Sequence, residues 1–119
     1  MQTMKLRAMQ DPGRTVELLD SFIRHEGRLT RDSHRLTEGG ELTPSLEKLA
    51  IRSIEDGNVW RAWTDDRAIW LWTCEVSLNL SRERGMPVMA VSRYDEFGAM
   101  EESGTWVCLG NDSWQRCEA

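Results

Sequence analysis

Three polar side chains of this sequence have the chemistry to serve a binding or catalytic site, namely Arg61, His25 and Tyr94. Arg61 stands in a tryptophan-rich segment, where a guanidinium either binds an anionic ligand or stacks on an indole ring and pairs with a carboxylate. His25 has an imidazole whose charge changes near neutral pH, although on the rim of a helix it more often makes a structural hydrogen bond. With Trp63 and Trp70 as walls, these groups form a candidate ligand pocket.

Local motifs of known chemistry are absent from the sequence. His25-Glu26 has no second histidine at metal-binding spacing, and there is no Gly-rich phosphate loop or nucleophile elbow. The paired acids Asp65-Asp66, Asp95-Glu96 and Glu101-Glu102 form no calcium loop and are interpreted as solubility charges. We therefore expect no metal and no cofactor. Whether the protein is an enzyme stays open, because a site assembled across a sheet leaves no local motif.

The chain is acidic, with a formal net charge of -5 and a sequence pI of about 5.0. Binding to nucleic acid relies on a basic surface, so we expect no nucleic-acid partner. Arg24, Arg28, Arg31 and Arg35 follow one another at spacings of four, three and four residues. A helix continuing past Gly27 would align them as a phosphate-binding stripe, but the acidic balance favours a solvated face paired with nearby carboxylates.

The length of 119 residues predicts a single domain, residues 1–119. No apolar run approaches the roughly 20 residues of a membrane span, and residues 1–10 lack the apolar stretch of a signal peptide. The three cysteines are odd in number and lack Cys-x-x-Cys spacing, which favours free thiols. We therefore expect a cytoplasmic protein with no membrane partner.

Two amphipathic helices are predicted in the helical half of the domain, residues 1–57. Asp11-Pro12 suits a helix start, and apolar residues recur at helical spacing over residues 13–28. Thr43-Pro44 repeats this signal for a second helix over residues 44–56, which Asp56-Gly57 ends. The polar segment between them, residues 30–41, is predicted to be a loop or a short helical turn.

The other half, residues 58–119, has the two-residue periodicity of β-strands. The predicted strands are residues 59–64, 68–80, 87–94 and 99–109, with Gly104 as a possible bulge. Turns are predicted at Asp65-Asp66, at residues 81–85 and 95–98, and before Trp114. All six tryptophans follow residue 59, so this half makes the core or the site.

Helices followed by a meander of strands predict an α+β fold, with the two N-terminal helices packed on one face of a four-stranded antiparallel sheet. This order of elements is similar to the cystatin-like and nuclear-transport-factor-2-like layouts, which place a pocket or a dimer face against a concave sheet. The similarity is one of layout, without matching motif residues, so it implies no particular site residue.

The first hairpin decides which side chains share a face of the sheet. With a two- or four-residue loop at Asp65-Asp66, Trp63 is expected to face Ala68, Arg61 to face Trp70 and Val59 to face Trp72, all on the apolar face of the long strand. Arg61 would then sit among tryptophans. A three-residue loop would reverse the faces of the first strand.

The opposite face of this hairpin is also apolar, although helices on one side of the sheet leave it uncovered. Trp60, Ile69 and Leu71 are therefore a candidate interface. The cover is either the tail that carries Trp114 or a second subunit, and we expect a homodimer or a higher oligomer.

Two functions follow from these patterns. The first is a non-catalytic binding or protein-interaction module that uses the tryptophan-rich sheet face. The alternative is a small-ligand-binding protein or enzyme with a pocket between the helices and the sheet. Convergence of Arg61 and His25 on one cavity would favour the alternative.

Overall fold

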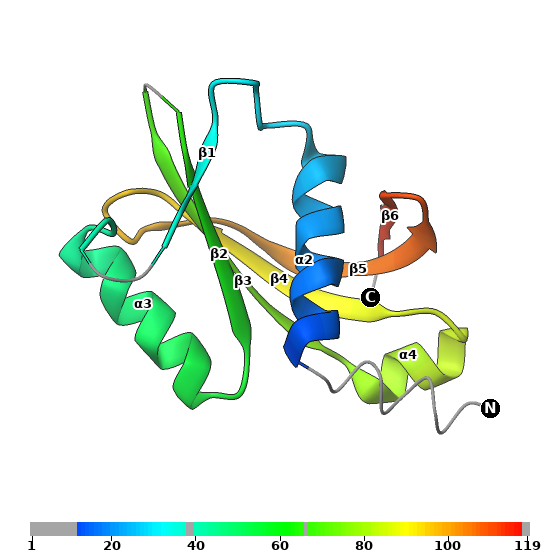
Figure 1. The fold of residues 1–119 in the computed structure, drawn as a ribbon. Helices are drawn as coiled ribbons and strands as arrows, with labels where there is room; N and C mark the ends of the chain where they lie inside the picture. The colour runs from blue at the N-terminus through cyan, green and yellow to red at the C-terminus, as the bar shows by residue number, and fades with distance from the viewer. Residues whose placement is uncertain (1–11, 38–39, 66, 118–119) are drawn as a thin grey trace.

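A computed structural model describes residues 12–37, 40–65 and 67–117 of the chain. Within them the fold is α+β, with three helices and one six-stranded antiparallel sheet (Figure 1). The helices are α2 (Pro12–Glu26), α3 (Pro44–Glu55) and α4 (Leu78–Arg84). The strands are β1 (His34–Leu36), β2 (Val59–Thr64), β3 (Ile69–Val76), β4 (Val88–Tyr94), β5 (Met100–Gly110) and β6 (Ser113–Arg116).

The strands lie in the sheet in the order in which they follow one another in the chain. The predicted class and the antiparallel meander are confirmed, whereas the predicted numbers of strands and helices are too low. Strand β1 forms inside the predicted loop, where Leu36 pairs with Ala62. Strand β6 follows a two-residue turn in which Asn111 and Asp112 have φ values of 51° and 59°, as a type I′ hairpin requires.

The long strand is shorter than predicted, because its apolar alternation continues into a helix. Strand β3 ends at Val76, and the Ser77 side chain accepts a hydrogen bond from the Leu80 backbone N–H at 3.3 Å as the N-cap of α4. Gly85 ends this helix in the left-handed conformation, with φ 69°. The strand predicted to residue 80 and the loop predicted at 81–85 are therefore wrong.

The first two helices cover opposite faces of the sheet, which corrects the prediction that both lie on one face. Helix α2 packs its Leu19, Phe22 and Ile23 against the face that carries most of the tryptophans. Helix α3 packs Leu46 and Ala50 against the other face. Apolar periodicity shows which side of each helix is buried but not which face of the sheet it meets. Strand β1 at the sheet edge carries the chain from one face to the other (Figure 1).

The tryptophan-rich face is the main core of the molecule. Trp72, Trp106 and Trp114 are buried beneath α2. The Phe22 ring lies 4.8 Å from Trp106 and 5.7 Å from Trp114, and the Trp114 Nε1 donates to the Ser21 hydroxyl at 3.0 Å. This face of the sheet is therefore occupied by the chain's own helix.

Helix α3 covers the second apolar face of the first hairpin, on which the sequence predicts a dimer interface. Leu71 is fully buried within the chain, and Trp60 and Ile69 are half-buried against the same cluster. Trp114 lies on the other face, so the expected cover by the tail is wrong, and within the chain the cover is α3. Since α3 covers this face, an uncovered apolar surface no longer argues for oligomerisation through Trp60, Ile69 and Leu71. The oligomeric state itself stays a prediction.

The helix boundaries follow from their caps. Thr43 caps α3 as predicted, since its hydroxyl accepts from the Leu46 backbone N–H at 3.3 Å. Helix α2 ends at Glu26, because Gly27 adopts the left-handed conformation with φ 71°.

Some predictions lie outside the described residues: the cap at Asp11, the segment before it, and Asp66 of the first hairpin. In the described part of the chain, the helices are too short or too polar to traverse a lipid bilayer.

Candidate functional site

The side chain of Arg61 lies on the α2 face of the sheet, as the sequence predicts. The hairpin has a four-residue loop, so Trp63 pairs with Trp70 and Arg61 pairs with Trp72. The predicted face is confirmed, but each predicted partner is wrong by two residues, because a four-residue loop moves the pairing along β3. On the other side of β3, Trp72 pairs with Arg93. Two arginines thus flank one buried tryptophan.

Helix α2 supplies the carboxylate partner of Arg61. The Arg61 Nε and Nη2 atoms donate to the two carboxylate oxygens of Asp20 at 2.9 and 3.2 Å. The Arg61 side chain is 23% exposed and that of Asp20 is 28% exposed. The expected carboxylate pair of Arg61 is therefore confirmed, whereas the expected stacking on Trp70 is not found among the described residues. The guanidinium retains a solvent-facing part.

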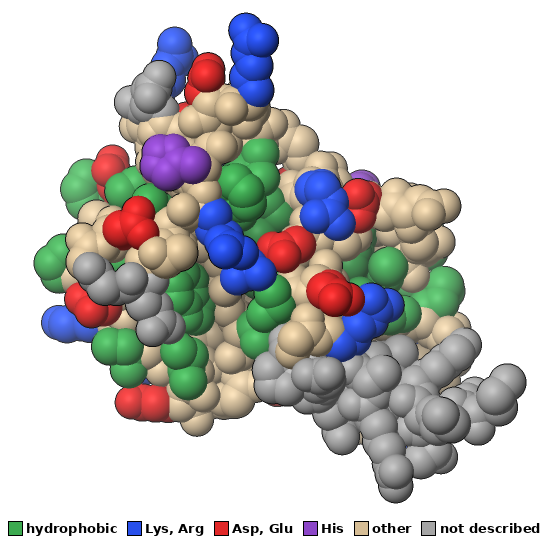
Figure 2. Space-filling model, in the orientation of Figure 1, with side chains coloured by type: hydrophobic (Ala, Val, Ile, Leu, Met, Phe, Trp, Pro, Cys, Tyr) green, Lys and Arg blue, Asp and Glu red, His purple; other side chains and the backbone are tan. Residues whose placement is uncertain are grey.

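A groove of about 640 Å³ lies at this edge of the sheet, bounded by α2, β1, β2 and the end of α3. We call it the edge groove. Figure 2 looks onto this side of the molecule and shows basic side chains, with acidic ones beside them, between the hydrophobic side chains over α3 and the region of α2. The described lining residues are Val16, Arg35, Leu36, Thr37, Ile54, Gly57, Asn58, Val59, Trp60 and Arg61.

The edge groove has apolar walls and positively charged side chains. Val16, Leu36 and Ile54 come from three different elements and line it together. Arg35 and Arg61 also line it, and the described lining includes no Asp or Glu. Across residues 12–37, 40–65 and 67–117, no carboxylate pairs with Arg35. Among the described residues, the groove therefore has a cation without an ion-pair partner, in a chain whose net charge is -5.

The five candidate pocket residues do not come together. Arg61 lines the edge groove, whereas Tyr94 packs with the α3 cluster on the opposite face. Trp63 and Trp70 pack at the margin of the α2 core, and the buried Nε1 of Trp63 has no hydrogen-bond partner among the described residues. His25 is exposed at the end of α2, beside a separate hollow of about 340 Å³.

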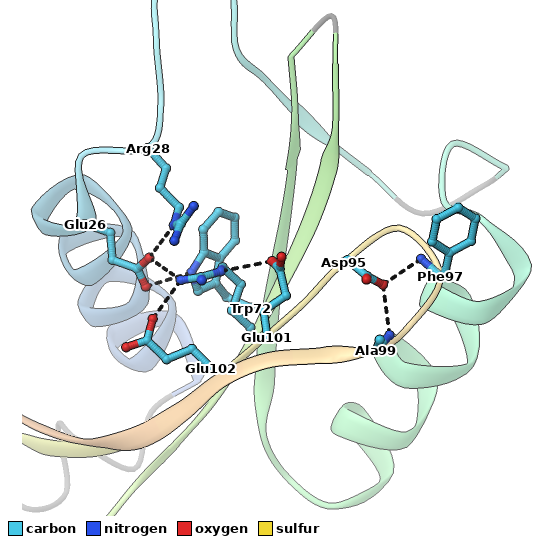
Figure 3. A network of polar contacts seen from close by, with 9 residues as sticks. Glu26, Arg28, Trp72, Asp95, Phe97, Ala99, Glu101 and Glu102 are labelled. Atoms are coloured by element: carbon cyan, nitrogen blue, oxygen red, sulfur yellow. Dashed lines mark hydrogen bonds and ion pairs between the residues drawn. The ribbon is translucent and has the colours of Figure 1, made fainter.

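Close to His25, an ion-pair network centres on the buried Arg93, which the sequence analysis did not identify. The Arg93 side chain is 6% exposed and lies 2.8 Å from Glu26, 3.3 Å from Glu101 and 3.0 Å from Glu102. Glu26 also accepts hydrogen bonds from Trp72 and Arg28, each at 3.1 Å (Figure 3). These contacts connect the end of α2 to strands β4 and β5.

The paired acids at 101–102 have this role because of a bulge. Arg93 pairs with Glu102 and Tyr94 pairs with Met100, so Glu101 is an extra residue and both glutamates reach Arg93. The predicted solubility role of Glu101-Glu102 is therefore wrong, and the bulge lies three residues before Gly104. Burial alone would lower the pKa of Arg93, but the charge of Glu26 and the hydrogen bonds to both glutamates raise it above its ordinary value.

The arginines after residue 23 do not form one helical stripe, because α2 ends at Glu26. Arg24 donates to both carboxylate oxygens of Asp112 at 2.8 and 3.0 Å. Hydrogen bonds from Arg24 and then Ser21 lower the pKa of Asp112 from 3.8 to about 2. Arg28 pairs with Glu26, and Arg35 lies on β1.

In the described part of the chain, no three His, Cys, Asp or Glu side chains gather where they could hold a metal ion. Arg93 shares the parity of the buried Met89 and Val91 along β4, and this alternation is the sequence signal that could have identified it. No protein-family model, curated protein or solved structure gives a significant match to this chain.

Proposed function

We propose that this protein is a non-catalytic binding protein whose edge groove takes a small, elongated, amphipathic anion. The ligand has an apolar body and one acidic end group. The observation that carries this proposal is the position of Arg35, a cation without a described carboxylate partner at the margin of an apolar groove.

The size and walls of the groove support an apolar ligand body. A volume of about 640 Å³ lies within the range of small-molecule sites, which is about 300–1,000 Å³. Contact with Val16, Leu36 and Ile54 removes apolar ligand surface from water, which contributes about 25 cal/mol per Å² before the cost of association is subtracted.

The charges of the groove support an acidic end group. Arg35 pairs with Trp63 across β1 and β2, and Arg61 lies two residues before Trp63, so both guanidinium groups start from the same face of the sheet. Asp20 neutralises Arg61, so Arg35 supplies the free positive charge. A carboxylate can accept two parallel hydrogen bonds from one guanidinium, which gives orientation as well as affinity.

The polar groups of the groove suit binding better than acid–base chemistry. Apart from the arginines, the described lining offers the Thr37 hydroxyl and the Asn58 amide, with no imidazole, carboxylate or thiol. We place the protein in the cytoplasm, in keeping with its three free cysteines, Cys74, Cys108 and Cys117.

Displacement of a fluorescent probe tests the proposal. Anilinonaphthalene sulfonate is an apolar anion that should bind wild-type protein, and decanoate should displace it more strongly than decanol does. Arg35→Gln should weaken decanoate binding about tenfold, equivalent to about 1.4 kcal/mol, and leave decanol binding unchanged.

Arg82→Gln is the matched control, because Arg82 is exposed on α4 and does not line the groove. This variant should bind decanoate as wild type does. The proposal fails if decanoate does not displace the probe, or if Arg35→Gln and Arg82→Gln bind decanoate equally well.

A further inference from the structure

The turn between β4 and β5 presents an exposed aromatic ring. Phe97 is 78% exposed, more than any other described large hydrophobic side chain. Its neighbour Asp95 accepts hydrogen bonds from the backbone N–H groups of Phe97 and Ala99, both at 2.9 Å, and Figure 3 shows the Phe97 ring standing out from this turn beside α3. The ring is therefore held outward by an ordered turn.

The turn is also fixed against α3. The Thr43 hydroxyl donates to the Glu96 carbonyl oxygen at 2.8 Å. Gly98 has φ 83°, and a Cβ atom there would lie 3.2 Å from the Cβ of Ser45. Because only glycine combines this conformation with so close an approach, the position of Phe97 relative to α3 is well defined.

A shallow groove of about 490 Å³ lies next to this ring, along the outer side of α3. Ile51, which is 50% exposed, contributes an apolar part of its lining. Its described lining residues are Ser45, Lys48, Leu49, Ile51, Arg52, Glu55, Phe97 and Gly98. We call the ring and this groove together the Phe97 surface.

The Phe97 surface contains both acidic and basic side chains. Lys48 and Arg52 lie one helical turn apart in the groove, and no carboxylate in the described part of the chain pairs with either. Glu96, next to the ring, likewise has no cationic partner there. The projecting turn is thus acidic, and the described lining of the adjacent groove has two cations, Lys48 and Arg52, and one carboxylate, Glu55.

We propose that the Phe97 surface binds the same surface of a second copy of this chain, with the Phe97 ring of each copy entering the groove of the other. Projection and groove lie side by side on one patch, and that is the arrangement that a two-fold symmetric, self-complementary interface requires. The acidic turn of one copy meets Lys48 and Arg52 of the other. This interface is independent of the edge groove and of the ligand proposed for it.

Sedimentation equilibrium of the full chain tests the proposal. Wild type should approach twice the 13.7 kDa chain mass as its concentration rises. Phe97→Ser should raise the dimer dissociation constant at least tenfold. Leu109→Ser is the matched control, because Leu109 is exposed on β5 outside this surface, and it should leave the dissociation constant unchanged. Circular dichroism confirms that each variant is folded.

A charge exchange tests the arrangement within the dimer. Lys48→Glu and Glu96→Lys should each weaken the dimer, and the double variant should restore it, because opposite charges face each other again. The proposal is overturned if wild type stays monomeric, if Phe97→Ser and Leu109→Ser dimerise equally well, or if the double variant is no stronger than the single variants.

Discussion

Arg61 and Arg93 occupy matching positions in the sheet and differ in how completely they are enclosed. They pair with Trp72 from opposite sides, and each binds a carboxylate of α2, Asp20 for Arg61 and Glu26 for Arg93. Arg93 is 6% exposed and contacts three carboxylates, whereas Arg61 is 23% exposed and contacts one.

The difference separates a structural cation from one available for binding. A guanidinium has five N–H donors, and the Nε and Nη1 atoms of Arg93 donate to Glu26, Glu101 and Glu102. Arg61 uses Nε and Nη2 for Asp20 and borders the edge groove. Residue type alone does not distinguish the two, but the number of carboxylates around each does.

The largest expected effect comes from the tryptophan that both arginines flank. Trp72→Ala should lower the free energy of unfolding by about 3–5 kcal/mol, because it empties a large, fully buried site under α2. Trp70→Ala should cost less, since Trp70 is only half-buried. Urea unfolding measures both, and equal losses would contradict a core centred on Trp72.

Removal of Arg93 should have the next largest effect. Arg93→Ala leaves Glu26, Glu101 and Glu102 close together without their shared cation, which should cost about 3 kcal/mol. Arg61→Ala should cost about 1 kcal/mol or less, because its ion pair is partly exposed. The comparison of the two arginines fails if urea unfolding gives the same loss for both variants.

Loss of the Asp20 charge should make the guanidinium of Arg61 available to a ligand in the edge groove. Asp20→Asn removes the charge that neutralises Arg61, so decanoate should bind the edge groove a few-fold more tightly. Glu26→Gln is the matched control at Arg93 and should leave decanoate affinity unchanged, since Arg93 does not line that groove. Probe displacement measures both, and weaker binding by Asp20→Asn would contradict the role given to Arg61.

The smallest effect concerns the exposed pair of Arg24 and Asp112. The pKa of Asp112 is lowered in the folded chain from 3.8 to about 2, so its contribution to stability is present above pH 3.8 and is lost as the pH falls through about 2. Titration of the Asp112 carboxyl carbon by NMR should report this low value. In Arg24→Gln the pKa should rise toward 3.8, and an unchanged value would exclude Arg24 as its cause.

The sequence predicts elements with long, regular patterns and fails for short ones. Strand β2, helix α3 and the side-chain direction of Arg61 follow from periodicity and hairpin parity. Strands β1 and β6 have three and four residues, too few for a recognisable period. Helix α4 was concealed because Leu78 and Leu80 continue the alternation of β3 beyond the Ser77 cap.

The edge groove was beyond sequence reasoning for a different reason. Its walls come from α2, the end of α3 and strands β1 and β2, and they meet at the edge of the sheet that β1 forms. Val16 and Ile54 look like ordinary positions on amphipathic helices in the sequence. Only the tertiary arrangement turns them into the walls of one groove.

The contact between α2 and β6 has a consequence for synthesis of the chain. Translation adds about 5–20 residues per second, so the 93 positions that separate Ser21 from Trp114 take on the order of 5–20 s. Phe22 lacks both of the indole rings that pack against it until Trp106 is made, and it lacks one of them until Trp114 is made. Nascent chains that stop before Trp114 therefore expose part of the apolar side of α2, which makes them substrates for chaperones and proteases.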